Sequence, residues 1–245
     1  MKIIIVLAFV LLSACMPAKK TESWEVNELF TQLSELRKEI GILKVDVKGL
    51  KQRAIKKTRN SKQAEIDLRH SFPMGKETAK YAIVEFTDYQ CPFCLKHRKK
   101  TFPLIKQQYI DTGKIKYFVK DFPLDFHSQA KNASISSLCA GQQGSFWEMH
   151  ELIFDNNRKL SEELFLQFAV QIKLDVSNFK KCLTSAEAKR VVDNNISEGE
   201  LIGVRGTPAF FVGKIQDNKL VDIRALYGVQ SFSSFSRVIN TLMQK

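Results

Sequence analysis

Apolar residues near the start of the chain recur at alternating steps of three and four. They are Val26, Leu29, Leu33, Leu36, Ile40, Leu43, Val47 and Leu50. This spacing is the a/d seam of a coiled coil, sustained over nearly four heptads. The a positions are mostly β-branched and every d position is leucine, a combination that favours two parallel strands.

The charged residues beside the seam agree with that arrangement. Glu39 and Asp46 fall at g positions, and Lys44 and Lys51 fall at the following e positions. A parallel, in-register pair of chains would therefore match an acid to a base twice. We expect residues 22–50 to form an oligomerisation helix, with a dimer favoured over a trimer. The alternative is an amphipathic helix that folds onto its own domain.

Farther along, the apolar pattern predicts an α/β domain over residues 72–245. Residues 51–71 are basic and have no regular apolar period, so we interpret them as a linker. Strands are expected within 81–89, 114–122, 208–214 and 225–229, and helices after residue 91, through most of 129–195, and over 231–243. The first helix should bend or break near Pro103. A strand–helix–strand opening implies a right-handed parallel crossover, and the last two strands suit a hairpin.

Composition and charge narrow the function classes. The chain has 245 residues, of which 44 % are hydrophobic and 26 % charged, which suits one medium-sized domain with an appendage. The net charge of +12 favours solubility and contact with anionic surfaces. Aromatic residues are not interleaved with basic ones as in proteins that grip single-stranded nucleic acid. We therefore expect no nucleic-acid partner.

The N-terminus predicts the compartment. Residues 1–14 have one positive charge, a short apolar run and small residues, as a secretory signal peptide does, and the run is too short to span a bilayer. Leu12-Ser13-Ala14-Cys15 resembles a bacterial lipobox, whose cysteine is lipidated and becomes the first mature residue. We expect Cys15 to be that anchor, with a tether over 15–21. The chain would then face the periplasm from the inner or outer membrane, where disulfides persist. An ordinary signal peptide with an incidental cysteine is the alternative.

The cysteine count changes once the anchor is set aside. Four cysteines remain: Cys91, Cys94, Cys139 and Cys182. An even set in an oxidising compartment allows three pairings, and the close spacing of the first two favours pairing them. A zinc site that used this pair and His97 would lack a fourth ligand. We expect neither a metal nor another cofactor.

The pair Cys91 and Cys94 lies at the predicted start of a helix, where Pro92 suits the first turn. A thiol attacks as the thiolate, and the free N–H groups and dipole of a helix N-terminus stabilise that anion. Cys94 follows one turn later, in position to attack a mixed disulfide. We therefore assign Cys91 as the nucleophile and Cys94 as the resolving thiol.

Four motifs, in order along the chain, carry a family resemblance. They are EFTDYQCPFC, FPLDFH, QQGSFWEMHELIF and GVRGTPAFFV. Together they resemble the DsbA family of thioredoxin-fold thiol–disulfide oxidoreductases, and the coiled-coil leader on an anchored chain resembles the oligomeric and Com1-like members. The resemblance runs from about residue 72 to the C-terminus. It implies a thioredoxin-like α/β fold with a helical domain inserted over about 129–195.

The resemblance also implies roles for residues outside the dithiol. Glu85 corresponds to a buried acid that relays a proton to or from the resolving cysteine, although a salt-bridged or edge-exposed glutamate is the plainer alternative. Thr207 and Pro208 match the cis-proline loop that pairs with an extended substrate, against the alternative of a trans turn. Some members carry a second, structural disulfide, which implies a bond between Cys139 and Cys182. Two separate buried thiols are the alternative.

Two residues bear on whether the protein mainly forms disulfides or rearranges them. Phe93 stands where the best-known oxidases have a histidine, and a phenyl ring cannot donate to the thiolate, so we expect a less acidic Cys91 and a milder oxidant. Thr207 is more typical of isomerase-type members. We therefore expect an envelope oxidoreductase with isomerase activity, and oxidase activity beside it is left open. Its partners would be secreted or envelope proteins with cysteines and a membrane redox protein. A dedicated oxidase, or a structural lipoprotein with an inactive thioredoxin domain, is the alternative.

Overall fold

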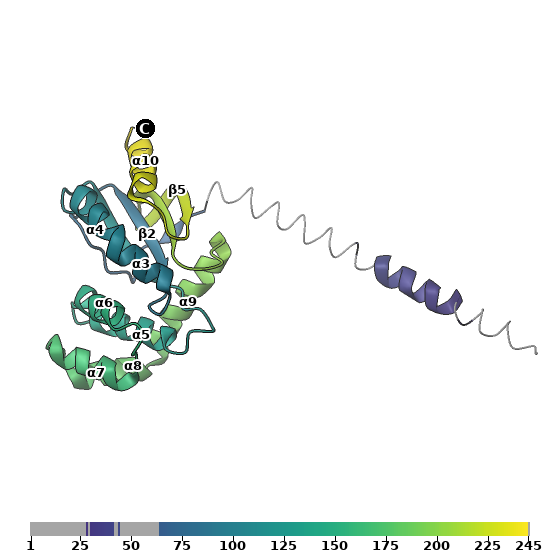
Figure 1. Ribbon diagram of the computed structural model, residues 1–245, viewed down its shortest axis with the longest axis horizontal. Coiled ribbons are helices and arrows are strands. Elements are labelled where there is room, and N and C mark those ends of the chain that lie inside the picture. The colour runs from purple at the N-terminus through teal and green to yellow at the C-terminus, as the bar shows by residue number, and fades with distance from the viewer. Residues whose placement is uncertain (1–27, 29, 42–43, 45–63, 245) are drawn as a thin grey trace, which may run out of the picture. The chain divides into compact units, whose positions relative to one another are not determined.

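A computed structural model describes residues 28, 30–41, 44 and 64–244 (Figure 1). The expected signal peptide (1–14), Cys15 and the tether (15–21) lie outside the described residues, as do parts of the seam and of the linker. The chain divides into two units, residues 1–59 and 60–245. In the first unit, residues 30–41 are helical and exposed. Pairing of the seam between two chains stays a prediction.

A five-stranded sheet forms the centre of the second unit. Its strands are β1 (Ile66–Asp67), β2 (Tyr81–Thr87), β3 (Ile115–Asp121), β4 (Ala209–Gln216) and β5 (Lys219–Tyr227), in the order β1-β5-β4-β2-β3. The β2–β3 pair is parallel and β4–β5 is an antiparallel hairpin. The parallel pairing of the first two expected strands and the hairpin of the last two are therefore confirmed.

The folded unit begins earlier than expected. The linker was expected to continue to residue 71, but Ile66 pairs with Leu220 of β5 and is fully buried, and Leu68 is buried as well. A strand of two residues is too short to show an alternating pattern, so the sequence carries no periodic signal for it. The boundary at residue 72 is therefore wrong by several residues.

Nine helical segments lie within residues 64–244. They are α3 (Pro92–Lys100), α4 (Phe102–Ile105), η2 (Lys106–Ile110), α5 (Ala130–Gly141), α6 (Phe146–Asp155), α7 (Glu162–Gln171), α8 (Val176–Thr184), α9 (Ala186–Ile202) and α10 (Phe232–Met243). The first helix breaks at Thr101, two residues before Pro103, as expected. The helical block runs past residue 195 because α9 continues until Gly203 caps it in the left-handed conformation, which glycine adopts without strain.

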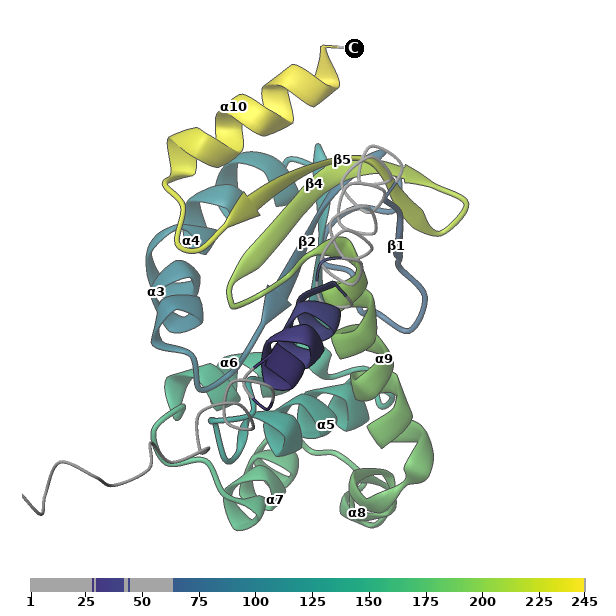
Figure 2. The same ribbon diagram turned by 90° about the vertical axis from the view of Figure 1, so that its right-hand side faces the viewer.

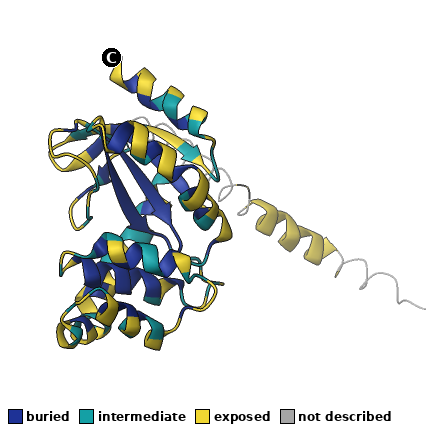
Figure 3. Ribbon diagram, turned by 60° about the vertical axis from the view of Figure 1, so that its left-hand side comes forward, coloured by how far each residue is buried: buried dark blue, intermediate teal, exposed yellow. Residues whose placement is uncertain are grey.

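The two faces of the sheet are covered by different helices (Figure 2). Ile83 and Phe210 pack with α4, η2 and α10. Val84 and Phe211 point the opposite way and pack in a cluster with Ile196 and Ile202 of α9. Successive strand residues point to opposite faces, and six consecutive residues of β2 are buried (Figure 3). Both faces of β2 are therefore covered. Odd-numbered residues of β2 therefore face the side covered by α4 and α10.

The helices inserted between β3 and β4 build a core of their own. Phe154 of α6, Phe165 of α7 and Phe179 of α8 are almost fully buried in it. Cys91 and Cys94 pack against the same cluster. The dithiol thus lies where the inserted helices meet the sheet domain.

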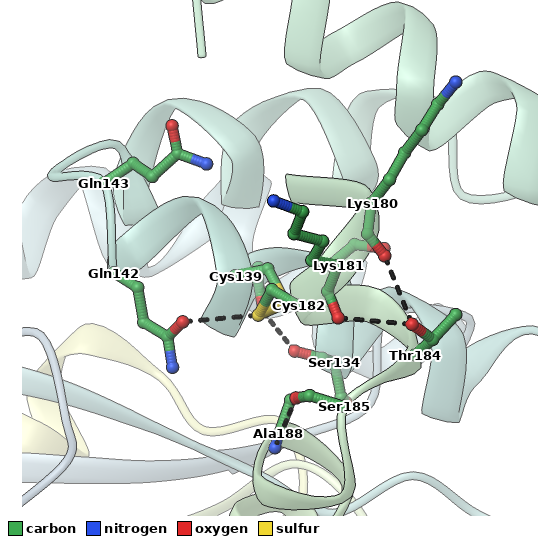
Figure 4. Close-up of a disulfide and its surroundings, with 12 residues drawn as sticks. Ser134, Cys139, Gln142, Gln143, Lys180, Lys181, Cys182, Thr184, Ser185 and Ala188 are labelled. Atoms are coloured by element: carbon green, nitrogen blue, oxygen red, sulfur yellow. Dashed lines mark hydrogen bonds between the residues drawn. A yellow bond between two sulfur atoms is a disulfide. The ribbon is translucent and has the colours of Figure 1, made fainter. Parts of the chain in front are cut away.

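A disulfide between Cys139 of α5 and Cys182 of α8 joins two of the inserted helices (Figure 4). Their Cα atoms are 5.7 Å apart, within the usual range for a disulfide. Gln142 Oε1 lies 3.3 Å from the Cys182 sulfur. The bond closes a loop with a sequence separation of 43.

Candidate active site

The loop between β2 and α3 is fixed by the fully buried side chain of Asp88. Its Oδ1 accepts from the backbone N–H of Gln90 at 2.7 Å and of Cys91 at 3.2 Å. Its Oδ2 accepts from the N–H of Leu124 at 2.7 Å and lies 2.8 Å from His127 Nδ1. Asp88 therefore ties the dithiol loop to the segment after β3. Sequence reasoning gave this residue no role, although an aspartate between a strand and a helix start is a common loop-fixing signal.

Cys91 is the N-cap residue of α3 and is 3 % exposed. Its thiol lies 3.4 Å from the carbonyl oxygen of Thr207, and the peptide bond between Thr207 and Pro208 is cis. The structure therefore brings together the dithiol and the proline loop, which are more than a hundred residues apart in the sequence.

The pKa values of the two thiols shift in opposite directions, down for Cys91 and up for Cys94. A hydrogen bond from Cys94, helped by the backbone N–H groups of Phe93 and Cys94 and opposed by burial, lowers the pKa of Cys91 from 9.0 to about 5. Burial, together with the bond to Cys91, raises the pKa of Cys94 well above 9.0. At neutral pH the pair holds one thiolate, on the residue at the helix start.

We expect the Cys91 thiol of the reduced protein to ionise with a midpoint near pH 5. The thiolate absorbs near 240 nm, so a pH titration of the reduced chain measures this pKa, and the Cys91→Ser variant gives the baseline. Because the folded-state pKa is depressed, the stability that the thiolate adds is complete above pH 9 and is lost as pH falls through about 5. A midpoint near 9 would contradict the assignment.

Glu85 is buried on β2, on the face covered by α3 and α4. Its Oε1 accepts from Thr87 Oγ1 at 3.0 Å and its Oε2 from the Tyr117 hydroxyl at 2.6 Å. Burial raises the pKa of Glu85 from 4.5 to about 7, although these two bonds and the charge of Arg98 offset part of the rise. A carboxyl group with this pKa both accepts and donates protons at neutral pH. Sequence reasoning found Glu85 but missed Tyr117.

An open hollow of about 560 Å³ lies beside the proline loop. It is lined by Gly203, Arg205, Gly206, Thr207, Pro208, Tyr227 and Gly228. Tyr227 is 52 % exposed, and Phe93, between the two cysteines, is 59 % exposed. Exposed aromatic side chains of this kind are common at surfaces that bind other proteins. Within the described part of the chain, no cluster of three or more histidine, cysteine or acidic residues could hold a metal ion. In the same part, no helix is both long and apolar enough to cross a bilayer.

The chain is similar in sequence and in fold to several known proteins. A family model described as thioredoxin matches residues 68–227, more than half of the chain. A probable disulfide bond formation protein D of Bacillus anthracis is 31 % identical over 147 residues, which cover 57 % of this chain and 68 % of the relative. The Na(+)/H(+) antiporter NhaA 3 of Salinispora tropica is 29 % identical over 153 residues, 62 % of this chain, and the chain spans only 23 % of the antiporter's length.

Among solved structures, alpha-DsbA1 of Wolbachia pipientis superposes with a TM-score of 0.61 at 24 % identity. The match covers 72 % of this chain and 92 % of that one. At this identity the likeness concerns the fold, including the helices inserted into the thioredoxin core. The chain therefore belongs to the thioredoxin family and has the DsbA-like form of its fold, a form found in protein disulfide oxidoreductases.

Proposed function

We propose that this protein is a thiol–disulfide oxidoreductase that acts on other proteins through Cys91 and Cys94. The main support is that the two cysteines differ. Cys91, at the start of α3 beside the cis-proline loop, has a lowered pKa, and Cys94, one turn later, is buried and has a raised pKa. Two cysteines that bind zinc or serve only a structural purpose would not need pKa values shifted in opposite directions. The relatedness to a disulfide bond formation protein supports the same activity.

The reaction proceeds through a mixed disulfide. When the protein oxidises a substrate, a substrate thiolate attacks Cys91 of the oxidised pair and Cys94 leaves. A second substrate thiolate then attacks the mixed disulfide, and Cys91 leaves as the stable thiolate. When the protein reduces or isomerises a substrate, the Cys91 thiolate attacks a substrate disulfide, and Cys94 resolves the mixed disulfide. Glu85 exchanges a proton with Cys94 in both directions, for which its pKa near 7 is suited.

The proline loop and the hollow beside it form the substrate site. An extended substrate chain pairs with the backbone next to Pro208 as an added strand does, while Phe93 and Tyr227 offer exposed aromatic surface on which substrate side chains pack. The substrates are secreted or envelope proteins that contain cysteines, a choice that the lipobox-like sequence at Cys15 supports. A membrane redox protein regenerates the pair.

Within this activity we favour disulfide isomerisation by a homodimer. The heptad seam over residues 22–50 supports dimerisation, and two catalytic domains held together can grip a misfolded substrate while its bonds exchange. Phe93 and Thr207 support a Cys91–Cys94 disulfide that is a weaker oxidant than that of a dedicated oxidase. Phe93 offers no side-chain hydrogen-bond donor to the Cys91 thiolate. A dedicated oxidase is the second candidate, because the pKa of Cys91 near 5 still stabilises the reduced form.

A truncation tests the isomerase proposal. The short chain begins at residue 60, because a start at residue 72 would remove β1. We expect sedimentation to show this chain as a monomer and the soluble chain from residue 16 as an oligomer. Reactivation of scrambled ribonuclease should fall in the short chain, while insulin reduction stays the same. Equal isomerase activity in both chains, or a monomeric long chain, would mean that the seam serves another purpose.

A further inference from the structure

The side chain of Thr87 lies between the buried acid and the resolving cysteine. Thr87 ends β2, is fully buried, and faces the same side of the sheet as Glu85 because the two are separated by one residue. Its hydroxyl donates to Glu85 Oε1 at 3.0 Å. The same side chain also acts on Cys94, where it favours the thiolate and so offsets part of the rise in pKa that burial causes. One hydroxyl group therefore interacts with both partners of the proton exchange.

The other oxygen of Glu85 is already occupied. Tyr117 donates to Oε2 at 2.6 Å, and its hydroxyl oxygen lies 3.1 Å from His97 Nε2. Since a tyrosine has one hydroxyl proton and an ionised carboxylate only accepts, the His97 ring must donate through Nε2. The Tyr117 proton is thereby held toward Glu85. Oε1, on the Thr87 side, is the oxygen left to receive a proton.

The other titratable or charged groups that act on Glu85 are poor carriers. Arg98 stays protonated, and Cys91 is bonded to the substrate sulfur at this stage. Burial raises the pKa of Tyr117 well above 10.0 and lowers that of His97 to about 3, so neither changes its charge near neutral pH. A hydroxyl group needs no change of net charge to pass a proton on.

We propose that the Thr87 hydroxyl carries the proton between Cys94 and Glu85, a step that rests on the oxidoreductase function proposed above. As Cys94 attacks, its S–H bond breaks and the proton moves to Thr87 Oγ1, while the original Thr87 proton moves to Glu85 Oε1. The electron pair on the Cys94 sulfur forms the bond to Cys91, and the substrate leaves as a thiolate. Thr87 ends as it began, and the sequence runs in reverse when Cys94 is the leaving group.

The test measures the resolution step by itself in the full chain. A mixed disulfide is formed between Cys91 and a cysteine peptide, and its decay is followed by acid quenching and mass spectrometry. General acid–base catalysis contributes on the order of 100-fold or more, so we expect Thr87→Val, which keeps the side-chain shape, to slow the decay at pH 7 by about 10-fold or more. Thr87→Ser should restore most of the rate. Thr101→Val, which removes another buried threonine hydroxyl, is the matched control and should stay within about twofold of the wild type.

Two further results separate a relay from a structural role. In a Glu85→Gln background, Thr87→Val should cost almost nothing more, because the two residues act in one step. In the wild type, the decay rate plotted against the deuterium content of the solvent should curve, as expected when two protons move together. This measurement needs no variant, so it decides even where Thr87→Val does not fold. A straight plot, a normal decay rate in Thr87→Val, or additive effects of the two substitutions would overturn the relay. Failure of the wild type to form or resolve any mixed disulfide would instead contradict the proposed function.

Discussion

Cys91→Ser is expected to abolish disulfide exchange, whereas Cys94→Ser is expected to accumulate covalent adducts with substrate proteins. The first variant lacks the thiol whose pKa falls to about 5, and serine does not ionise near neutral pH. The second variant keeps that nucleophile but loses the thiol that resolves the intermediate. Insulin reduction should fall to the uncatalysed rate in the first variant, and non-reducing gels of the second should show adducts that disappear with dithiothreitol.

The two variants control for each other because both replace a buried sulfur at the start of α3, one at its N-cap and one in its first turn. Similar losses of activity without adducts in either variant would point to a folding defect, which circular dichroism would reveal. Adducts that form in Cys91→Ser but not in Cys94→Ser would reverse the assigned roles. Activity that survives in Cys91→Ser would remove the dithiol from the mechanism.

Replacing both Cys139 and Cys182 by alanine is expected to lower the free energy of unfolding by about 4 kcal/mol. The bond closes a loop with a sequence separation of 43, and this estimate follows from the chain entropy that such a loop removes from the unfolded state. Helix α8 depends strongly on the bond, because Phe179 is its one fully buried side chain. Urea denaturation of the variant and of the wild type, both with Cys91 and Cys94 reduced, measures the difference.

The wild type offers a control for this prediction. Gentle reduction should open only the pair at α3, so alkylation followed by mass spectrometry should find Cys139 and Cys182 protected. Full reduction should bring the wild type to the stability of the double variant. A loss of less than about 1 kcal/mol, or free thiols at both positions in protein isolated from the cell envelope, would show that the bond does not stabilise the protein.

The parts of the fold that the sequence predicts are those with local signals. Strand β2 has a run of β-branched and aromatic residues, and α3 has a proline in its first turn, so both could be found without a structure. Strand β1 could not be found because two residues show no period. The extension of α9 to Ile202 was missed because its last turns bury few side chains on a regular stripe, while its end depends on the conformation of Gly203.

At the candidate site, too, the residues with a local sequence signal were predicted, and those whose contacts depend on the fold were not. Cys91 and Cys94 lie in one short motif, and the family resemblance pointed to Glu85 and Pro208. Tyr117 could not be assigned because its contact with Glu85 depends on the register of the parallel β2–β3 pair, which places Tyr117 opposite Ile83. Register follows from packing across the whole sheet and leaves no mark within either strand. Asp88 was missed for a related reason, since its second set of partners comes from the distant segment that follows β3.

If Cys91 exchanges disulfides with protein substrates, the mixed disulfide should be trapped on the wild-type chain. The oxidised protein is mixed with a reduced two-cysteine peptide, quenched in acid at short times, and analysed by mass spectrometry with fragmentation. We expect a transient adduct on Cys91, followed by one reduced protein and one oxidised peptide in equal amounts. An adduct that maps to Cys94, Cys139 or Cys182, or peptide oxidation without reduction of the pair at α3, would contradict it.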